Sequence, residues 1–119
     1  MTDFKRGDVV LVLFPNSNLQ TAKKRPALVV QADNLETNLP QVLVAMITSN
    51  MSRANHHSRV AIYLDASKPS DTGLQLDSVI VTDNLATVQH KFIDKVLGHL
   101  TRMADVESAL AHTFALNLA

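Results

Sequence analysis

Lys23-Lys24-Arg25-Pro26-Ala27-Leu28-Val29-Val30 places three cations directly before an apolar, β-branched run. Pro26 restricts Arg25 to an extended backbone, and residues 27–31 have the composition of a buried strand. Arg25 is therefore expected at the start of a strand, where a rigid scaffold can direct its guanidinium. A planar fork with five donors suits a phosphate group. A solvated hairpin tip, with cations that protect a sheet edge, explains the same pattern.

Short strands are predicted on both sides of this segment. They have apolar or alternating sequences and cover residues 8–14, 41–48, 59–64, 78–82 and 85–88, the last two separated by the turn-prone Asp83-Asn84. Polar loops are expected at residues 15–24, 32–40, 50–58 and 65–75. Short strands with polar connections indicate a mainly β (α+β) fold, a small barrel or a sandwich, with residues 1–119 in one domain.

The end of the chain has a helical rather than an alternating pattern. From residue 101 onward, one helical face collects Met103, Val106, Leu110, Thr113 and Phe114, and Thr101 is the expected N-cap. A shorter helical turn is predicted at residues 91–97. The apolar surface of the C-terminal helix exceeds what a small barrel needs to cover, so we expect it to pack on the barrel or on a partner.

Composition excludes several classes of chemistry. The chain has no cysteine and only three glycines, so a thiolate metal site, a cysteine nucleophile and a glycine-rich phosphate loop are ruled out. The first residues carry an acid and no apolar run follows them, and no stretch approaches the roughly 20 apolar residues of a membrane span. We therefore expect a cytoplasmic protein with no membrane partner.

The net charge is zero, but the charges are unevenly distributed. Residues 1–60 hold seven Lys or Arg against four acids, and residues 61–119 hold four against seven. This asymmetry permits an RNA-binding face in the first half. Chance distribution of surface charges in a short chain explains it equally well.

Two further segments carry candidate groups. Thr48-Ser49-Asn50 closes a predicted strand with hydroxyl and amide groups that can donate to phosphate oxygens, although such residues also end strands for local backbone reasons. His56-His57 are candidates for acid–base work or for an exposed loop. No nearby carboxylate completes a two-histidine metal site, so no metal is expected. His90, His99 and His112 are interpreted as isolated residues.

Several motifs occur in the order typical of one known family. They are Lys5-Arg6-Gly7-Asp8-Val9-Val10, Lys24-Arg25-Pro26-Ala27-Leu28-Val29-Val30, Ile47-Thr48-Ser49-Asn50, Gly73-Leu74, Asp77-Ser78-Val79-Ile80-Val81 and Leu85-Ala86-Thr87-Val88. In this order, the chain resembles the MazF/PemK family of type II toxin–antitoxin ribonucleases over nearly its whole length. The loop 16–22 and Ala86 depart from the common family pattern.

The resemblance implies an SH3-like barrel of about six to seven strands with a C-terminal helix, usually as a homodimer. It implies metal-independent, sequence-specific cleavage of single-stranded RNA by 2′-hydroxyl attack, without a cofactor, and neutralisation by a cognate antitoxin. Arg25 and Thr48 correspond to the catalytic pair. The expected RNA-binding residues are Asn16, Ser17, Lys23, Lys24, Ser49, Asn50, Arg53, His56, His57 and Ser78.

Two alternatives remain open at this point. A gyrase inhibitor like CcdB has the same fold without the ribonuclease motif, and Arg25-Pro26 together with Thr48 argues against it. An inactive member could act with its antitoxin in DNA-binding autoregulation. In that case the antitoxin usually supplies the DNA-reading element, so contact with DNA would be indirect.

Overall fold

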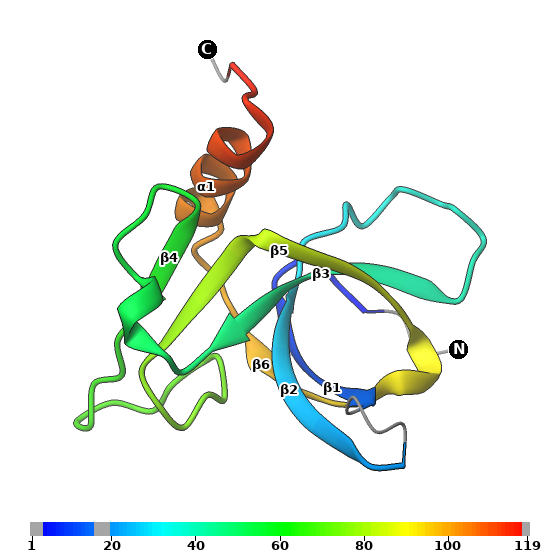
Figure 1. Ribbon diagram of the computed structural model, residues 1–119, viewed down its shortest axis with the longest axis horizontal. Coiled ribbons are helices and arrows are strands. Elements are labelled where there is room, and N and C mark those ends of the chain that lie inside the picture. The colour runs from blue at the N-terminus through cyan, green and yellow to red at the C-terminus, as the bar shows by residue number, and fades with distance from the viewer. Residues whose placement is uncertain (1–3, 16–19, 118–119) are drawn as a thin grey trace.

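The computed structural model describes residues 4–15 and 20–117, in which one antiparallel sheet carries a C-terminal helix (Figure 1). The strands are β1 (Asp8–Pro15), β2 (Ala22–Val29), β3 (Gln41–Thr48), β4 (Arg59–Ile62), β5 (Ser78–Gln89) and β6 (Ile93–His99). Their order in the sheet is β4-β5-β3-β2-β1-β6. Figure 1 shows that the sheet curls into a small barrel, with the helix α1 (Ala104–Phe114) at one side. The prediction of a mainly β barrel with a C-terminal helix is confirmed.

Parts of β1, β2, β3 and β5 bury side chains on both faces, which explains the nearly continuous apolar sequence of these parts. One cluster of side chains, including Leu28, Ile80 and Val106, forms a core to which α1 contributes. A second cluster lies on the other face of the same strands and includes Val29, Val44 and Val88. Leu28 and Val29 are neighbours that point into different clusters, as alternation along a strand requires.

The strand β5 corrects one prediction, because residues 78–82 and 85–88 belong to a single long strand. Against β3, Ala45 pairs with Leu85 whereas Met46 pairs with Val81, so residues 82–84 form a bulge. A bulge adds unpaired residues without ending a strand. The turn-prone Asp83-Asn84 therefore marks this bulge, and not a turn between two strands.

The predicted helical turn at residues 91–97 is wrong for most of its length. A 3₁₀ turn, η2 (His90–Phe92), is followed by β6, which pairs with β1. Two register irregularities interrupt this pairing, next to Val9/Val10 and Leu11/Val12. They break the alternation of side chains along β6, and the sequence consequently has a helix-like spacing of apolar residues.

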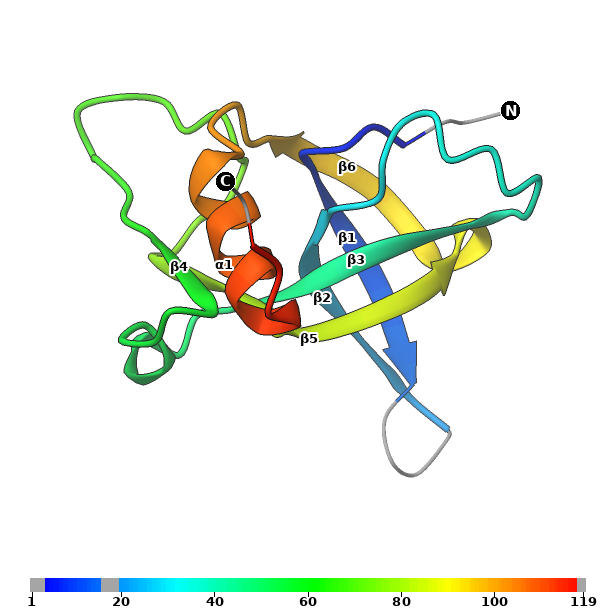
Figure 2. The same cartoon turned by 90° about the horizontal axis from the view of Figure 1, so that it is seen from above.

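Two boundaries also differ from expectation. The strand β2 begins at Ala22 and pairs with the end of β1, so Lys23 and Lys24 lie on a hairpin and not in a loop. In Figure 2 this hairpin extends away from the helix. The helix starts at Ala104, with Met103 at the N-cap and no side-chain cap, so Thr101 does not cap it. Acidic residues in the first turn favour the helix start through the helix dipole.

The helix packs as predicted through Val106, which is fully buried, and through Met103 and Leu110. Phe114 departs from the predicted face, because 54% of it is exposed, and Leu116 behind it is 59% exposed. Across residues 4–15 and 20–117, every helix is too short or too polar to span a bilayer.

Candidate active site

The ends of β2 and β3 bring Arg25 and Thr48 to the same pocket. Ala27 pairs with Met46, and Arg25 and Thr48 lie two residues beyond this last recorded pair on β2 and β3. Both residues line an open pocket of about 470 Å³. The predicted pair, distant in sequence, therefore shares one surface depression.

The charged lining of this pocket is mostly cationic. Arg25, Arg53 and Arg59 contribute guanidinium groups, and Asp83 is the carboxylate among the lining residues. Such an excess of positive charge attracts an anionic ligand, and guanidinium groups can bind phosphate oxygens bidentately. The pocket can therefore hold a phosphodiester and stabilise additional negative charge on it.

The hydroxyl of Thr48 is oriented by its own backbone. Its Oγ1 accepts a hydrogen bond from the backbone N–H of Asn50 at 3.1 Å. Because this bond uses only a lone pair, the hydroxyl hydrogen stays available to donate to a ligand oxygen. The Asn50 side chain instead supports the 3₁₀ turn η1 (Met51–Arg53), since its Oδ1 accepts from the backbone N–H of Ser52 at 3.1 Å.

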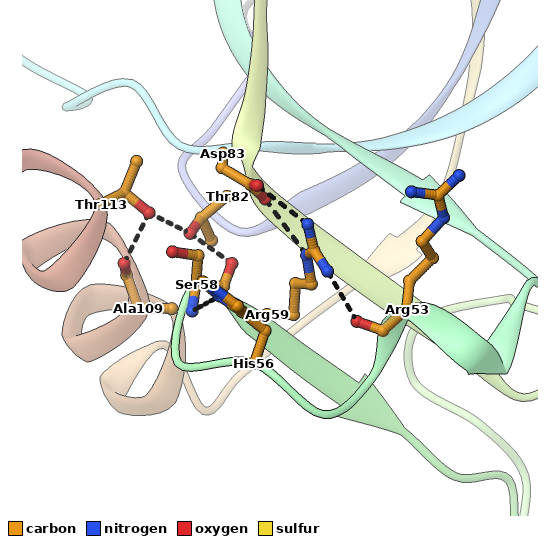
Figure 3. Close-up of polar contacts among 8 residues, drawn as sticks. All are labelled: Arg53, His56, Ser58, Arg59, Thr82, Asp83, Ala109 and Thr113. Carbon is orange, nitrogen blue, oxygen red and sulfur yellow. Dashed lines mark hydrogen bonds and ion pairs between the residues drawn. The ribbon is translucent and has the colours of Figure 1, made fainter.

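An ion pair forms one wall of the pocket (Figure 3). The Nε and Nη2 of Arg59 donate to the two carboxylate oxygens of Asp83, at 3.3 and 2.9 Å. This hydrogen bonding by Arg59 lowers the pKa of Asp83 below its ordinary value of 3.8. Arg59 Nη1 also donates to the carbonyl of Arg53 at 3.4 Å, so the guanidinium is held from two sides.

Arg59 and Asp83 are site residues that the sequence pattern does not predict. Arg59 begins an edge strand and Asp83 lies in the bulge of β5, which directs a polar residue toward the pocket. The polar Asp83-Asn84 pair within an apolar segment was a signal for an irregular strand. Its position at the pocket depends on the pairing of β5 with β3, which the local sequence does not reveal.

The other predicted RNA-binding residues are distributed over several places. Arg53 and Asn50 line the pocket with Arg25, whereas His56 and His57 line a neighbouring one. Lys24 forms an ion pair with Asp94 at 3.2 Å, and Lys23 and Ser49 are exposed outside the pocket lining. Ser78 is buried and donates to the carbonyl of Leu76, so it does not reach the pocket. Asn16 and Ser17 lie outside the described residues.

The remaining histidines are not isolated, contrary to expectation. His99 Nδ1 lies 3.0 Å from a carboxylate oxygen of Asp8, and the His90 ring contacts the Phe4 ring edge-on at 5.0 Å. His112 lies 5.2 Å from His57, ring centre to ring centre. Within the described part of the chain, no three His, Cys, Asp or Glu side chains are placed to hold a metal ion.

The ion pair leads to a prediction about stability. We expect Asp83→Asn to lower the free energy of unfolding by about 0.5 kcal/mol, because a partly exposed bidentate pair is lost. The folded-state pKa of Asp83 lies below the unfolded one, so its contribution is present above the unfolded pKa. It disappears as the pH falls through the folded value. Urea unfolding should therefore show a constant difference between pH 5 and 8 that shrinks once the pH falls below the unfolded value of about 4 and vanishes only below the folded pKa.

Asp94→Asn is the matched control, because it removes a single, more exposed contact with Lys24. Its effect on the free energy of unfolding should be smaller. A difference between wild type and Asp83→Asn that grows as the pH falls from 5 to 3 would contradict the assigned direction of the pKa.

Together, the barrel and the pocket define a small β protein with an open pocket lined by arginine and threonine. Residues 5–114 match the family described as PemK-like, MazF-like toxin of type II toxin-antitoxin system. The chain belongs to this family, and the resemblance seen in its motifs is confirmed.

Individual relatives agree with this membership. The chain is 31% identical over 116 residues to the endoribonuclease MazF of Staphylococcus epidermidis, a match that covers 95% of this chain and 92% of that protein. The prediction of an endoribonuclease-class enzyme agrees with the name of this relative.

Solved structures support the fold. An endoribonuclease from Mycobacterial species matches with a TM-score of 0.74 at 22% identity, covering 100% of this chain and 98% of that one. A Mycobacterial endoribonuclease solved with its cognate antitoxin has a TM-score of 0.74 at 22% identity and coverage of 98% and 99%. MazE–MazF from Deinococcus radiodurans (Form-II) matches with a TM-score of 0.73 at 16% identity, covering 98% and 100%.

Proposed function

We propose that this chain is a toxin that cleaves single-stranded RNA at a specific sequence, without a metal, and thereby inhibits translation and growth. The observation that carries the proposal is the common pocket of Arg25 and Thr48. A guanidinium and an orientable hydroxyl at one open, cationic surface can serve an RNA phosphodiester. RNA itself supplies the nucleophile.

In the proposed reaction, the ribose 2′-oxygen attacks the adjacent phosphorus while the bond from phosphorus to the 5′-oxygen breaks. The 2′-hydroxyl loses its proton and the leaving 5′-oxygen gains one. The products are a 2′,3′-cyclic phosphate, which water can open to a 3′-phosphate, and a 5′-hydroxyl end. Arg25 stabilises the charge on the pentacoordinate phosphate, because its fork can donate two hydrogen bonds.

Thr48 holds the phosphate in this scheme. Its Oγ1 already accepts from the backbone of Asn50, so its hydrogen is left to donate to a nonbridging oxygen. Arg53 lines the same pocket and can attract the RNA backbone on either side of the cleaved bond. Arg59, which Asp83 holds, would form a fixed wall for the strand.

We also propose that the protein acts in the cytoplasm, and we propose its antitoxin partner, its oligomeric state and its relation to DNA. A cognate antitoxin is its protein partner, by analogy with the Mycobacterial and Deinococcus radiodurans complexes. Its oligomeric state is a homodimer, supported by Phe114 and Leu116, which leave apolar surface exposed at the end of α1. Contact with DNA would occur only through the antitoxin.

Incubation of the purified protein with single-stranded RNA in EDTA tests the central proposal. We expect cleavage at a recurring short sequence, with 5′-hydroxyl ends that polynucleotide kinase labels without prior phosphatase treatment. Cleavage should continue at full rate in EDTA, because RNA supplies the nucleophile and the described lining supplies the charge. Intact RNA, or ends that carry a 5′-phosphate, would reject the reaction.

A further inference from the structure

A second pocket lies beside the proposed active site, between β4 and α1, and has a volume of about 550 Å³. Three imidazoles line it: His56 and His57 from the loop before β4, and His112 from α1. The His112 ring centre lies 5.2 Å from that of His57 and 6.1 Å from that of His56. We call this pocket the histidine groove.

Buried and partly buried hydrogen bonds hold the two sides of the histidine groove together (Figure 3). Thr82, fully buried in the bulge of β5, donates through Oγ1 to the carbonyl of Ser58 at 2.6 Å. The same hydroxyl lies 2.9 Å from that of Thr113, whose single hydrogen can be donated either to Thr82 or to the carbonyl of Ala109 at 2.9 Å. Ser58 directly follows His57 and Thr113 directly follows His112, so these contacts hold the backbone segments that carry the two rings next to each other.

The ring of His56 is also oriented. Its Nδ1 accepts a hydrogen bond from the backbone N–H of Ser58 at 3.0 Å, so the neutral ring carries its hydrogen on Nε2. That nitrogen is then a donor and not a metal ligand. The histidine groove consequently offers a hydrogen-bond donor together with aromatic faces, which suits a planar organic group.

Arg59 connects this groove to the proposed active site. Its side chain lines both pockets, and Asp83 holds its guanidinium between them. A strand whose phosphate lies at Arg25 can therefore continue past Arg59 to the histidines. Asp105 also lines the groove and disfavours a second phosphate there, whereas an uncharged base is tolerated.

We propose that the histidine groove binds one base of the RNA strand next to the cleaved phosphodiester. Proteins recognise single-stranded RNA by stacking splayed bases on aromatic rings, histidine included, and by donating to base edges. A base between two rings needs them about 7 Å apart, at contact distances of about 3.5 Å on each side. At 5.2 Å and with their planes tilted by 48°, His57 and His112 are too close for this, so a base stacks on the face of one ring, His112, while His57 lies at its edge.

The inference rests on the proposed function and adds a specificity site to it. His112 is the residue that tests it, because it is exposed and comes from α1, outside the proposed catalytic pocket. The probe is a fluorescent single-stranded RNA that contains the mapped cleavage sequence, with a 2′-deoxy sugar at the cleaved nucleotide. In a matched series, each flanking nucleotide in turn is made abasic, and affinity is measured by anisotropy.

For the wild-type protein, we expect one flanking abasic position to weaken binding about tenfold, as for the loss of one stacked base. His112→Ala should weaken binding of the complete RNA by about the same factor, and the abasic change should then cost less than about twofold. His112→Phe, which keeps an aromatic face, should restore most of the affinity. His90→Ala, which removes an imidazole outside both pockets, should behave like wild type.

Cleavage kinetics provide a second measurement. His112→Ala should raise KM about tenfold and leave kcat within about twofold of wild type, because the groove binds substrate away from the reacting atoms. An abasic penalty that persists unchanged in His112→Ala would overturn the proposal. So would a variant that binds RNA normally but loses affinity for the antitoxin. If the wild-type protein cleaves no RNA, the proposed function fails. If it cleaves RNA but the abasic penalty is the same in wild type and His112→Ala, only the proposal for the histidine groove is rejected.

Discussion

Arg25→Ala should reduce the kcat for RNA cleavage by about 10²–10³-fold, the cost of removing a positioned donor to transition-state charge. The effect on RNA binding should be smaller, because Arg53 and Arg59 still line the pocket. Single-turnover cleavage of a labelled RNA at saturating protein measures the chemical step directly. Growth after induction in cells gives an independent readout, since the loss of cleavage should remove growth inhibition.

Two controls separate geometry from charge. Arg25→Lys keeps the positive charge but loses the planar fork, so its kcat should remain well below that of wild type. Lys24→Ala removes the neighbouring cation, which is on the opposite side of β2 and pairs with Asp94. Its kcat should stay within about twofold of wild type. Cleavage by Arg25→Ala at the wild-type rate would remove Arg25 from the mechanism.

Gly73→Ala should destabilise the fold by about 3–5 kcal/mol, because backbone strain and overpacking act together. The φ of Gly73 is +72°, a left-handed conformation that costs energy for any residue with a Cβ. An added Cβ would also lie 2.1 Å from the carbonyl oxygen of Leu97 in β6, closer than nonbonded atoms approach. Relief would require β6, a barrel strand, to shift.

Gly98, in β6 itself, meets the same limit from the other side. A Cβ added to it would lie 2.2 Å from the carbonyl oxygen of Asp71. The two glycines thus permit close packing of residues 71–73 against β6. Urea unfolding with a thermal melt measures the effect of Gly73→Ala, and Lys95→Ala on the exposed side of β6 is the control. A free energy of unfolding within about 1 kcal/mol of wild type would contradict this packing.

Much of the fold could be predicted because its signals are local. The strands around Ala27–Leu28 and Val42–Ile47 are marked by β-branched runs, and the helix by its 3.6-residue spacing. Arg25 and Thr48 were recognised through the family resemblance, since an arginine before proline and a threonine at a strand end have ordinary structural explanations. Their shared pocket depends on the register of β2 and β3.

The features that escaped prediction depend on contacts between distant segments. The helix-like spacing of β6 results from irregular pairing with β1, which the sequence of β6 alone does not reveal. Arg59 becomes part of the pocket through Asp83, and His112 joins His57 through packing of α1. Local sequence patterns therefore predict where the strands lie, whereas contacts between distant segments determine which side chains meet.

The bulge at residues 82–84 also bears on how this chain can change in length. Two neighbouring residues of this bulge make different contacts. Thr82 donates to the carbonyl of Ser58, beside α1, and Asp83 accepts from Arg59 in the pocket. Inserting or deleting one residue here would rotate one of these attachments to the wrong face of β5. Residues 32–40 are exposed and lie outside the pocket lined by Arg25 and the histidine groove. Lengthening a loop of this kind by a few residues adds little entropic cost to its closure. We therefore expect insertions and deletions to be tolerated at 32–40 and to destabilise the protein at 82–84.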